Sequence, residues 1–284
     1  GNYVGTDASG MRPLGNTEDG VLLVNGASWN RVAGNLISAN RGNGITVLGG
    51  QGHVVQGNVI GTDPAETAAL GNLGDGIRME QGASELRIGA DGDGIGDETE
   101  GNVIAFNRRD GVTVVGGDAL RNTIRRNSIY SNTQLGIDLA DDGVTLNDKG
   151  STTSTTPLPP DTDAGPNLLQ NFPEVSSSRK TASGVNAGVN VSGVLKSTPQ
   201  RTFVIDLYLA EHANGSGRRW LASVQRTTNS EGSVAFSFNR PLGEAEVGQF
   251  VTTTATEVVS RSQGRIVGPT SEFSPPRQIT GQGG

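Results

Sequence analysis

The sequence lacks cysteine and has few bulky apolar residues, with 4% aromatic and 33% hydrophobic residues among 284 positions. Without cysteine, neither disulfide bonds nor thiol chemistry can operate. Two histidines, His53 and His212, stand far apart and do not have the spacing of a metal site. The scarcity of large side chains argues against a thick central core. It favours a fold that buries small aliphatic residues in many thin layers.

Positive charge is also scarce, because 22 Lys and Arg stand against 29 Asp and Glu, which gives a net charge of −7. This balance argues against nucleic acid as a partner, since nucleic acid is bound by basic surfaces. It is compatible with divalent cations or neutral sugars. No apolar run approaches the roughly 20 residues of a membrane span, so no membrane insertion is expected. The chain opens within a repeat, and we expect it to belong to a larger parent polypeptide.

What the sequence does contain is glycine, at 43 positions, and a repeat. The stretch "GNYVGTDASGMRPLGNTEDGV" (1–21) returns as "GNVIGTDPAETAALGNLGDGI" (57–77), at an offset of 56 residues. A fixed period of this kind indicates a repeat architecture. Shorter relatives stand between and after the two long copies: "GNLISAN" (34–40), "GNVIAFN" (101–107) and "RNSIYSN" (126–132).

Each repeat contains three short strand-like segments separated by Gly or Asn corners. The corner glycines are spaced by 24, 32, 35 and 25 residues, at Gly20, Gly44, Gly76, Gly111 and Gly136. A basic turn of about 24 residues therefore carries insertions. One is the "GTD…LGN" loop, at 5–16 and again at 61–72, and the other is "ADGDGIGDETE" at 90–100.

Three short strands per turn predict a right-handed parallel β-helix. In "DGIRME", Ile77 and Met79 alternate with Arg78 and Glu80, as expected when one side of a strand faces a core. The inward positions of the other turns are aliphatic in the same way. A recurrent corner asparagine is expected to stack in a ladder through its side-chain amide. Its members are Asn2, Asn35, Asn58, Asn102 and Asn127.

A second corner is expected where "GTD" aligns with the other repeats. There Asp7 and Asp63 align with Asn40, Asn107 and Asn132, and we interpret both aspartates as corner residues. His53 aligns with Asn30 and Asn122 and is interpreted as a substituted ladder member rather than a base.

The motifs "GNVIGTD…LGN…DGI", "GNVIAFN" and "LGIDLADDG…NDKG…DTDAGPNLLQNFPEV" resemble those of bacterial right-handed parallel β-helix repeat proteins. More broadly, they resemble the parallel β-helix superfamily of carbohydrate-binding proteins and sugar hydrolases. The resemblance covers residues 1–175 and implies the fold more strongly than the activity. It implies a protein of the bacterial cell surface or exterior, acting on a polysaccharide.

The repeat stops near Asp142, and the sequence then changes character. We divide the chain into a β-helix at 1–142, a Pro/Thr/Asp-rich connector at 143–172 and a β-sandwich at 173–284. Segments such as "TFVIDLYLA" and "GSVAFSFN" alternate with the period of strands and predict six to eight antiparallel strands in an Ig-like sandwich. This domain is expected to close the C-terminal edge of the β-helix or to carry the protein outward. Tyr208 and Trp220 are expected in its core.

Two acidic clusters are candidate calcium sites, because hard oxygen ligands at close spacing suit Ca²⁺. A solvated acidic turn is the alternative for both. The first is "DGDGIGDETE", with Asp91, Asp93, Asp97, Glu98 and Glu100. The second surrounds the junction, where an ion would pin the two domains together: Asp138, Asp141, Asp142, Asp148, Asp161 and Asp163.

The outward side of the "DG" strands is the candidate glycan surface. Its column reads Leu22, Thr46, Arg78, Thr113 and Asp138, and Glu80 lies beside it. We expect Arg78, Thr113 and Thr46 to bind substrate. The candidate catalytic carboxylates are Glu80, Asp138, Asp110 and Asp75. Asp75 and Asp110 stand on adjacent coils and are expected about 5 Å apart, the spacing of a retaining glycosidase. The Cα atoms of Glu80 and Asp138 are expected about 11–12 Å apart, so this pair is marginal unless the side chains lean together. For Asp75 and Asp110 the favoured interpretation is structural, as turn-forming side chains bonded to nearby backbone.

Two functions remain open. The first is an extracellular glycan-directed protein that binds a polysaccharide along this face, in a groove walled by loops 61–72 and 90–100, with hydrolysis of the bound polysaccharide left open. The second is a non-catalytic cell-surface stalk or adhesin. Outward aromatic residues, which commonly stack on sugar rings, are few.

Overall fold

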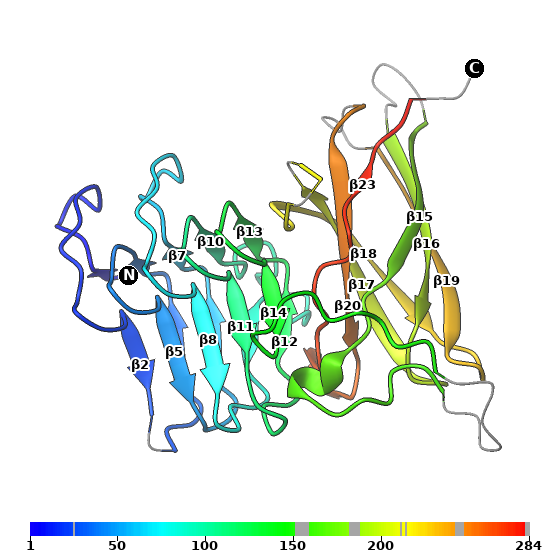
Figure 1. Ribbon diagram of the computed structural model, residues 1–284, viewed down its shortest axis with the longest axis horizontal. Helices are drawn as coiled ribbons and strands as arrows, with labels where there is room; N and C mark the ends of the chain where they lie inside the picture. The colour runs from blue at the N-terminus through cyan, green and yellow to red at the C-terminus, as the bar shows by residue number, and fades with distance from the viewer. Residues whose placement is uncertain are drawn as a thin grey trace.

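The computed structural model describes residues 1–24, 26–150, 159–181, 188–210, 212, 213, 215–241 and 247–281. Strands of the first half form three parallel sheets (Figure 1). The first sheet contains β1 (Tyr3–Val4), β4 (Leu36–Ile37), β7 (Val59–Ile60), β10 (Val103–Ala105) and β13 (Ser128–Tyr130). The second contains β2 (Val21–Leu23), β5 (Ile45–Leu48), β8 (Ile77–Glu80), β11 (Val112–Val114) and β14 (Ile137–Leu139). The third contains β3 (Arg31–Ala33), β6 (Val54–Gln56), β9 (Arg87–Gly89) and β12 (Thr123–Arg125).

Each strand pairs with the equivalent strand of the next coil, so residues distant in sequence line up in files. Ile45 pairs with Ile77, Ile77 with Val112, and Val112 with Ile137. All four belong to one buried apolar core that runs the length of the coils. The predicted parallel β-helix and its inward files are therefore confirmed.

The predicted asparagine ladder is also present. From Asn35 to Asn127, each side-chain Oδ1 accepts the backbone N–H and the side-chain amide N–H of the preceding ladder residue at 2.9–3.1 Å, beginning with Asn2 as the first donor. The amide of Asn102 also donates to the carbonyl of Val55 at 2.8 Å. These bonds satisfy buried corner backbone groups that would otherwise lack partners.

A second ladder runs along the next corner, but the assignment of Asp7 and Asp63 to it was wrong. Its members are Asn16, Asn40, Asn72, Asn107 and Asn132. The 61–72 loop leaves the coil before this corner and returns at its last residue, so Asn72 supplies the rung. Asp63 instead accepts hydrogen bonds from the backbone of Thr67 and Ala68 inside the loop.

Two glycines make the loop possible where it leaves and rejoins the coil. Gly61 has a φ of 88°, and a Cβ there would lie 2.0 Å from the carbonyl oxygen of Ala105. A Cβ on Gly71 would lie 1.9 Å from the carbonyl oxygen of Phe106. Both positions therefore require glycine, because the neighbouring coil's backbone occupies the space of a side chain.

The second half is antiparallel and forms two sheets over a common apolar core. One sheet contains β15 (Glu174–Lys180), β16 (Gly188–Lys196) and β19 (Ser233–Pro241). The other contains β18 (Arg219–Thr227), β17 (Thr202–Ala210), β20 (Phe250–Glu257) and β23 (Arg277–Gln278). A hairpin, β21 (Ser260–Ser262) and β22 (Arg265–Val267), and a short helix, η1 (Pro166–Leu169), complete it. Residues 151–158 of the expected connector lie outside the described residues.

Residues of this half cover the last strand of each parallel sheet. On β13, the N–H of Ile129 donates to the carbonyl of Gly217 at 2.9 Å. On β12, the N–H of Ile124 donates to Thr270 Oγ1 at 2.9 Å, and on β14 the N–H of Leu139 donates to Glu272 Oε1 at 2.9 Å. The prediction that the tail closes this edge is confirmed, because these hydrogen bonds occupy backbone N–H groups that an open strand edge would leave unpaired.

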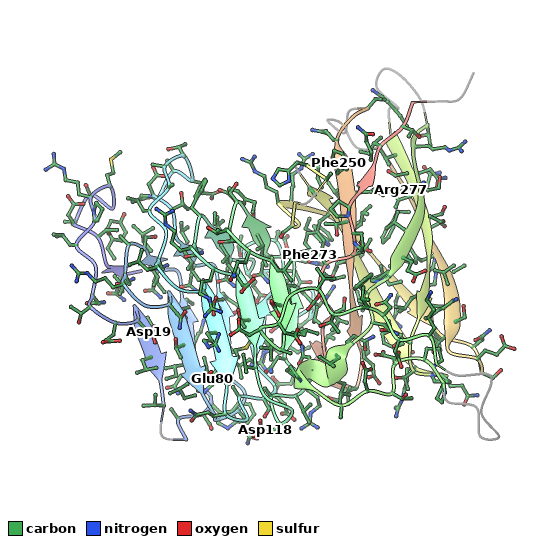
Figure 2. The ribbon with its side chains drawn as sticks, in the orientation of Figure 1. Asp19, Glu80, Asp118, Phe250, Phe273 and Arg277 are labelled. Atoms are coloured by element: carbon green, nitrogen blue, oxygen red, sulfur yellow. The ribbon has the colours of Figure 1, made fainter. Side chains whose placement is uncertain are left out.

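A buried ion pair joins the two halves. Arg125 of β12 and Asp206 of β17 have side chains 1% and 0% exposed, and Nε lies 2.7 Å from Oδ2. Beside them, Tyr208 packs edge-to-face on Phe273, with ring centroids 5.3 Å apart. Phe273 lies between the last coil and the sandwich (Figure 2).

Candidate functional site

The outer side of the second sheet has the predicted register, but most of its column is not open to solvent. Thr46 pairs with Arg78, Arg78 with Thr113, and Thr113 with Asp138. The exposed fractions of Thr46, Thr113 and Asp138 are 4%, 0% and 4%. The expectation that these three residues face solvent was therefore wrong.

Local hydrogen bonds hold the buried side chains of Thr46 and Asp138, whereas Thr113 Oγ1 has no hydrogen-bond partner in the described part of the chain. The amide of Asn43 donates to Thr46 Oγ1 at 2.9 Å. Asp138 accepts the backbone N–H of Asp141 at 2.9 Å and of Gly143 at 3.1 Å, which folds the chain after β14 back over the sheet. Burial raises the pKa of Asp138 above its ordinary value, against the effect of these bonds.

Arg78 is the centre of an ion-pair network on this face. Its guanidinium contacts Asp75 at 3.0 Å, Asp141 at 3.0 Å and Glu80 at 3.2 Å. Arg109 adds a contact of 2.6 Å to Asp141. Glu80 lies on the face of β8 (Figure 2) and keeps 28% of its side chain exposed. Asp142, in contrast, is exposed.

The acidic corner beside this network forms a file of its own. Each side chain accepts the backbone N–H of the equivalent residue in the next coil. Asp19 accepts from Asn43 at 2.6 Å, Asn43 accepts from Asp75 at 2.7 Å, and Asp75 accepts from Asp110 at 3.2 Å. Asp110 accepts the N–H of Leu135 at 2.7 Å. The predicted hydrogen bonds of Asp75 and Asp110 to nearby backbone are present. We call Asp19, Asn43, Asp75 and Asp110 the acidic file.

Asp110 differs from the other members in its ionisation. Burial raises its pKa to about 6, and nearby Asp138, Asp75 and Asp141 act in the same direction. Loss of water around a carboxylate penalises its charged form. Asp110 therefore holds its proton closer to neutrality than an ordinary aspartic acid does.

His53 occupies a ladder position, as predicted. It is 0% exposed, and its Nδ1 accepts the backbone N–H of Asn30 at 3.2 Å. Burial lowers its pKa, so the neutral ring is favoured. Asn167 of η1 ends this file by accepting the N–H of Asn122 at 2.8 Å.

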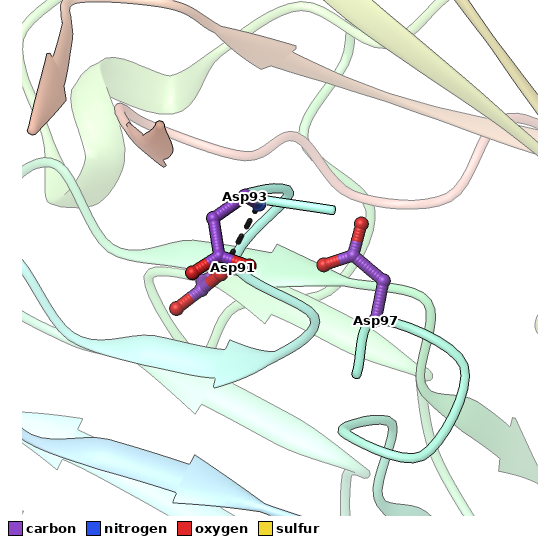
Figure 3. Close-up of side chains that lie close together, drawn as sticks. All are labelled: Asp91, Asp93 and Asp97. Carbon is purple, nitrogen blue, oxygen red and sulfur yellow. Dashed lines mark hydrogen bonds between the residues drawn. The ribbon is translucent and has the colours of Figure 1, made fainter. Parts of the chain in front are cut away.

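The loop 90–100 brings three carboxylates together. Asp91, Asp93 and Asp97 each offer an oxygen within 4.8 Å of the others (Figure 3). Arg265 of β22 pairs with Asp91 at 2.8 Å, and Arg126 pairs with Asp97 at 3.3 Å. Two arginines thus already neutralise this cluster in part.

The remaining acids of that loop do not join the three carboxylates. Glu100 Oε2 accepts the N–H of Asp91 at 3.1 Å, and burial raises the pKa of Glu100. Glu98 is exposed.

At the junction, the expected set of six acids is divided. Asp148, Asp161 and Asp163 lie within 4.8 Å of one another, whereas Asp138 and Asp141 belong to the second-sheet face. Burial raises the pKa of Asp161 to about 7, although Ser197 and Asn171 donate to it. Among the described residues, no lysine or arginine forms an ion pair with these three aspartates.

A groove of about 440 Å³ runs along the corner of the second ladder, from the first copy of the repeated loop past the second copy to the last coil. Pro13 lines it from the 5–16 loop and Ala69 from the 61–72 loop, and Phe106 lines it in the coil after the second loop. Both loops project on the same side of the coils (Figure 1). The expected partner of loop 61–72, loop 90–100, instead follows β9 on the third sheet and contacts β22 through Arg265.

Arginines from two coils line this groove, and sequence analysis missed them. Arg41 and Arg108 each follow a ladder asparagine, as do Leu73 and Thr133 in the other coils. The backbone N–H of each of these four residues donates to the carbonyl of the ladder asparagine in the preceding coil. The four residues therefore lie in one file. Both arginines are exposed, and neither has an ion-pair partner in the described part of the chain. We call this the arginine file; the recurring Asn-Arg pair at 40–41 and 107–108 was its signal.

Comparison with known proteins adds little to this geometry. No family model and no curated protein matches the chain. Tailspike protein 2 from Escherichia coli O157:H7 bacteriophage CAB120 is 8% identical with a TM-score of 0.30, over 94% of this chain and 47% of that one. The enzymatically active domain of tailspike protein 4 from bacteriophage CBA120 is 9% identical with a TM-score of 0.14, over 88% and 44%.

The chain thus spans about half the length of either tailspike structure. At these scores the fold assignment rests on the strand register and ladders of the chain itself. Within the described residues, no helix is long and apolar enough to span a membrane.

Proposed function

We propose that this chain is an extracellular glycan-binding β-helix module, and that the polysaccharide lies in the groove along the corner of the second ladder, beside loops 5–16 and 61–72. The observation that carries the proposal is the arginine file. Arg41 and Arg108 stand at equivalent places two coils apart, which corresponds to about 9.5 Å at the usual strand spacing. They are exposed beside a cavity of about 440 Å³.

The chemistry of this surface suits a sugar chain. A guanidinium presents several planar donors, which can bind hydroxyl oxygens or a carboxylate in pairs. Leu73, between the two arginines, is 55% exposed and offers an apolar contact. The ladders below hold the backbone in place, so binding costs little backbone conformational entropy.

Affinity electrophoresis through gels containing single polysaccharides tests this proposal. The double variant Arg41→Ala/Arg108→Ala is expected to lose at least tenfold in retention, with its melting temperature unchanged. Arg31→Ala removes an exposed arginine of the third sheet and serves as the matched control. Equal losses in both variants, or no retention of the unmodified protein by any neutral or acidic polysaccharide, would overturn the proposal.

Hydrolysis is a second candidate, favoured by one observation on the second-sheet face. Asp110, with a pKa of about 6, lies beside Asp75, which is ion-paired to Arg78. A protonated and an ionised carboxyl are what a glycosidase requires. Asp75 and Asp110 are 0% and 1% exposed, which favours binding without cleavage.

Reducing-end release from the retained polysaccharide decides between binding alone and hydrolysis. A hydrolase that uses Asp110 loses turnover in Asp110→Asn and keeps its fold, because Asn43 fills the same place in another coil. Glu80→Gln and Asp138→Asn test the other predicted carboxylates in the same way. A protein that binds the polysaccharide and releases no reducing ends has a binding function only.

The stalk or adhesin is the remaining alternative. It is favoured by the closed C-terminal edge and by the structural use of Asp75, Asp110 and Asp138. Retention of no glycan by the unmodified protein would support it. Calcium at either acidic cluster stays a prediction, and the junction cluster is the better candidate because arginines do not neutralise it.

A further inference from the structure

A second cavity, of about 800 Å³, lies where the β-helix meets the sandwich. Arg126 and Ser128 line it from the last coil. Arg219 and Trp220 line it from the start of β18, and Arg218 lines it from the position before that strand. Glu66, at the far end of loop 61–72, also lines it. Its volume is typical of small-ligand sites, which commonly occur between domains. Both halves of the chain therefore contribute to one cleft.

Trp220 is held rigidly at the edge of this cleft. Its Nε1 donates to Asp206 at 3.1 Å and to Ser223 at 3.3 Å, and Asp206 is itself fixed by Arg125. The prediction of a core role was right for Tyr208, which is 1% exposed, whereas Trp220 is only partly buried.

The arginines are positioned as well. The Arg126 guanidinium lies 4.3 Å from the centroid of the Trp220 ring and pairs with Asp97. Arg218 lies 4.7 Å from the centroid of the Tyr130 ring, and its carbonyl accepts a hydrogen bond from Ser128 at 2.5 Å. Stacking on aromatic rings limits the freedom of both guanidinium groups, so both are held in place at the cleft.

Glu66 is an unexpected residue at its position. Its φ is 60°, a left-handed conformation that is costly for residues other than glycine. At the equivalent position of the first loop, 56 residues earlier, stands Gly10, with a φ of 71°. Loop geometry alone would thus be served better by glycine. A strained residue facing a cavity is a reason to look for a role in binding.

We propose that this cleft binds an acidic sugar residue, whose carboxylate is held by Arg126, Arg218 and Arg219 and whose hydroxyl groups donate to Glu66. The inference rests on the proposed glycan-binding function and narrows it to acidic polysaccharides. Three cationic side chains around one carboxylate distinguish the cleft from the acidic surfaces elsewhere, in a chain of net charge −7. A ligand that carries both carboxylate and hydroxyl groups satisfies both kinds of side chain.

Trp220 provides a direct test, because Trp29 is the only other tryptophan. In a Trp29→Phe background, short oligomers of alginate, hyaluronan and polygalacturonate are titrated against Trp220 emission, beside neutral cello- and malto-oligomers. At least one acidic oligomer is expected to change the emission saturably, and the neutral ones are not. No change with any acidic oligomer, or an equal change with neutral ones, would overturn the inference.

Glu66→Gly separates a binding role from a structural one. It is expected to weaken binding of the active oligomer at least fivefold, while the melting temperature stays the same or rises. Arg218→Gln/Arg219→Gln should weaken binding at least tenfold, and Arg226→Gln, farther along β18, should bind normally. Normal binding by both cleft variants contradicts the inference.

Failure of this inference and failure of the proposed function have different signatures. If polysaccharides are retained through Arg41 and Arg108 while Trp220 emission does not respond, only the proposal of an acidic-sugar site in the cleft is wrong. If no polysaccharide is retained and Trp220 emission does not respond, both fall.

Discussion

The acidic file and the arginine file are built by the same repeat but use their charged residues in opposite ways. In the acidic file, a short side chain reaches the N–H of the next coil, and Asp75 and Asp110 are almost completely buried. In the arginine file, Arg41 and Arg108 point away from the ladder into solvent. Stacking alone therefore does not make a charged file functional. What matters is whether its side chains already have backbone or ionic partners.

The largest expected effect comes from the most completely partnered charges. Arg125→Ala should destabilise the protein by about 3–5 kcal/mol, because Asp206 would remain buried without its partner. Chemical denaturation measures this loss. A loss below about 1 kcal/mol, comparable to that of an exposed ion pair, would show that the interface does not depend on this pair.

The ladder should be nearly as sensitive. Asn102→Ala removes an acceptor for the N–H and amide of Asn58 and a donor to Val55, all in buried surroundings. Each unsatisfied buried group costs about 1–3 kcal/mol, so we expect a total of about 3 kcal/mol in denaturant titration. Asn2→Ala, at the exposed end of the same ladder, is the control and should cost less than about 1 kcal/mol.

The ionisation of Asp110 makes the stability of the folded protein depend on pH. Its pKa is raised to about 6 in the folded protein, so the folded state binds more protons than the unfolded state between pH 4 and 6. The contribution of this residue to stability therefore falls as pH rises through that window and stays low above it.

Asp110→Asn keeps the acceptor for Leu135 and removes this ionisation. We expect the variant to be more stable than the unmodified protein at pH 8 by about 1–3 kcal/mol, and little different at pH 4. Thermal melts across this range measure the difference. A variant that is less stable at pH 8 would show that the carboxylate stabilises the fold.

Calcium binding would distinguish acidic side chains that have no ionic partner from those that are already paired with arginine. If the junction aspartates bind the ion, 1 mM calcium should stabilise the protein by about 2 kcal/mol relative to chelator, seen as a higher melting temperature. Asp163→Asn should remove this response, and Asp93→Asn, in the arginine-neutralised loop, should retain it. An identical melt in calcium and chelator would exclude both sites.

The smallest effect on stability is expected at the arginine file. Arg41→Ala/Arg108→Ala should change the free energy of unfolding by less than about 0.5 kcal/mol, because both side chains are exposed and without ionic partners among the described residues. A larger loss of stability would show that Arg41 and Arg108 stabilise the fold, as the acidic file does.

Sequence periodicity was sufficient for the coil, the inward files and the first ladder, because strand alternation and corner asparagines are local signals. It failed at Asn72, since a loop that leaves and rejoins the coil shifts which residue supplies the rung. It also failed for Thr46, Thr113 and Asp138, because their burial depends on neighbouring coils and on the turn after β14. The Arg125–Asp206 pair joins residues 81 positions apart, and no spacing rule brings them together.

Affinity electrophoresis of Asp110→Asn beside Arg41→Ala/Arg108→Ala, in the same polysaccharide gel, tests the distinction between the two files most directly. The account predicts that the aspartate variant is retained like the unmodified protein and that the retention of the arginine variant is at least tenfold weaker. Retention of the arginine variant together with release of the aspartate variant would contradict it.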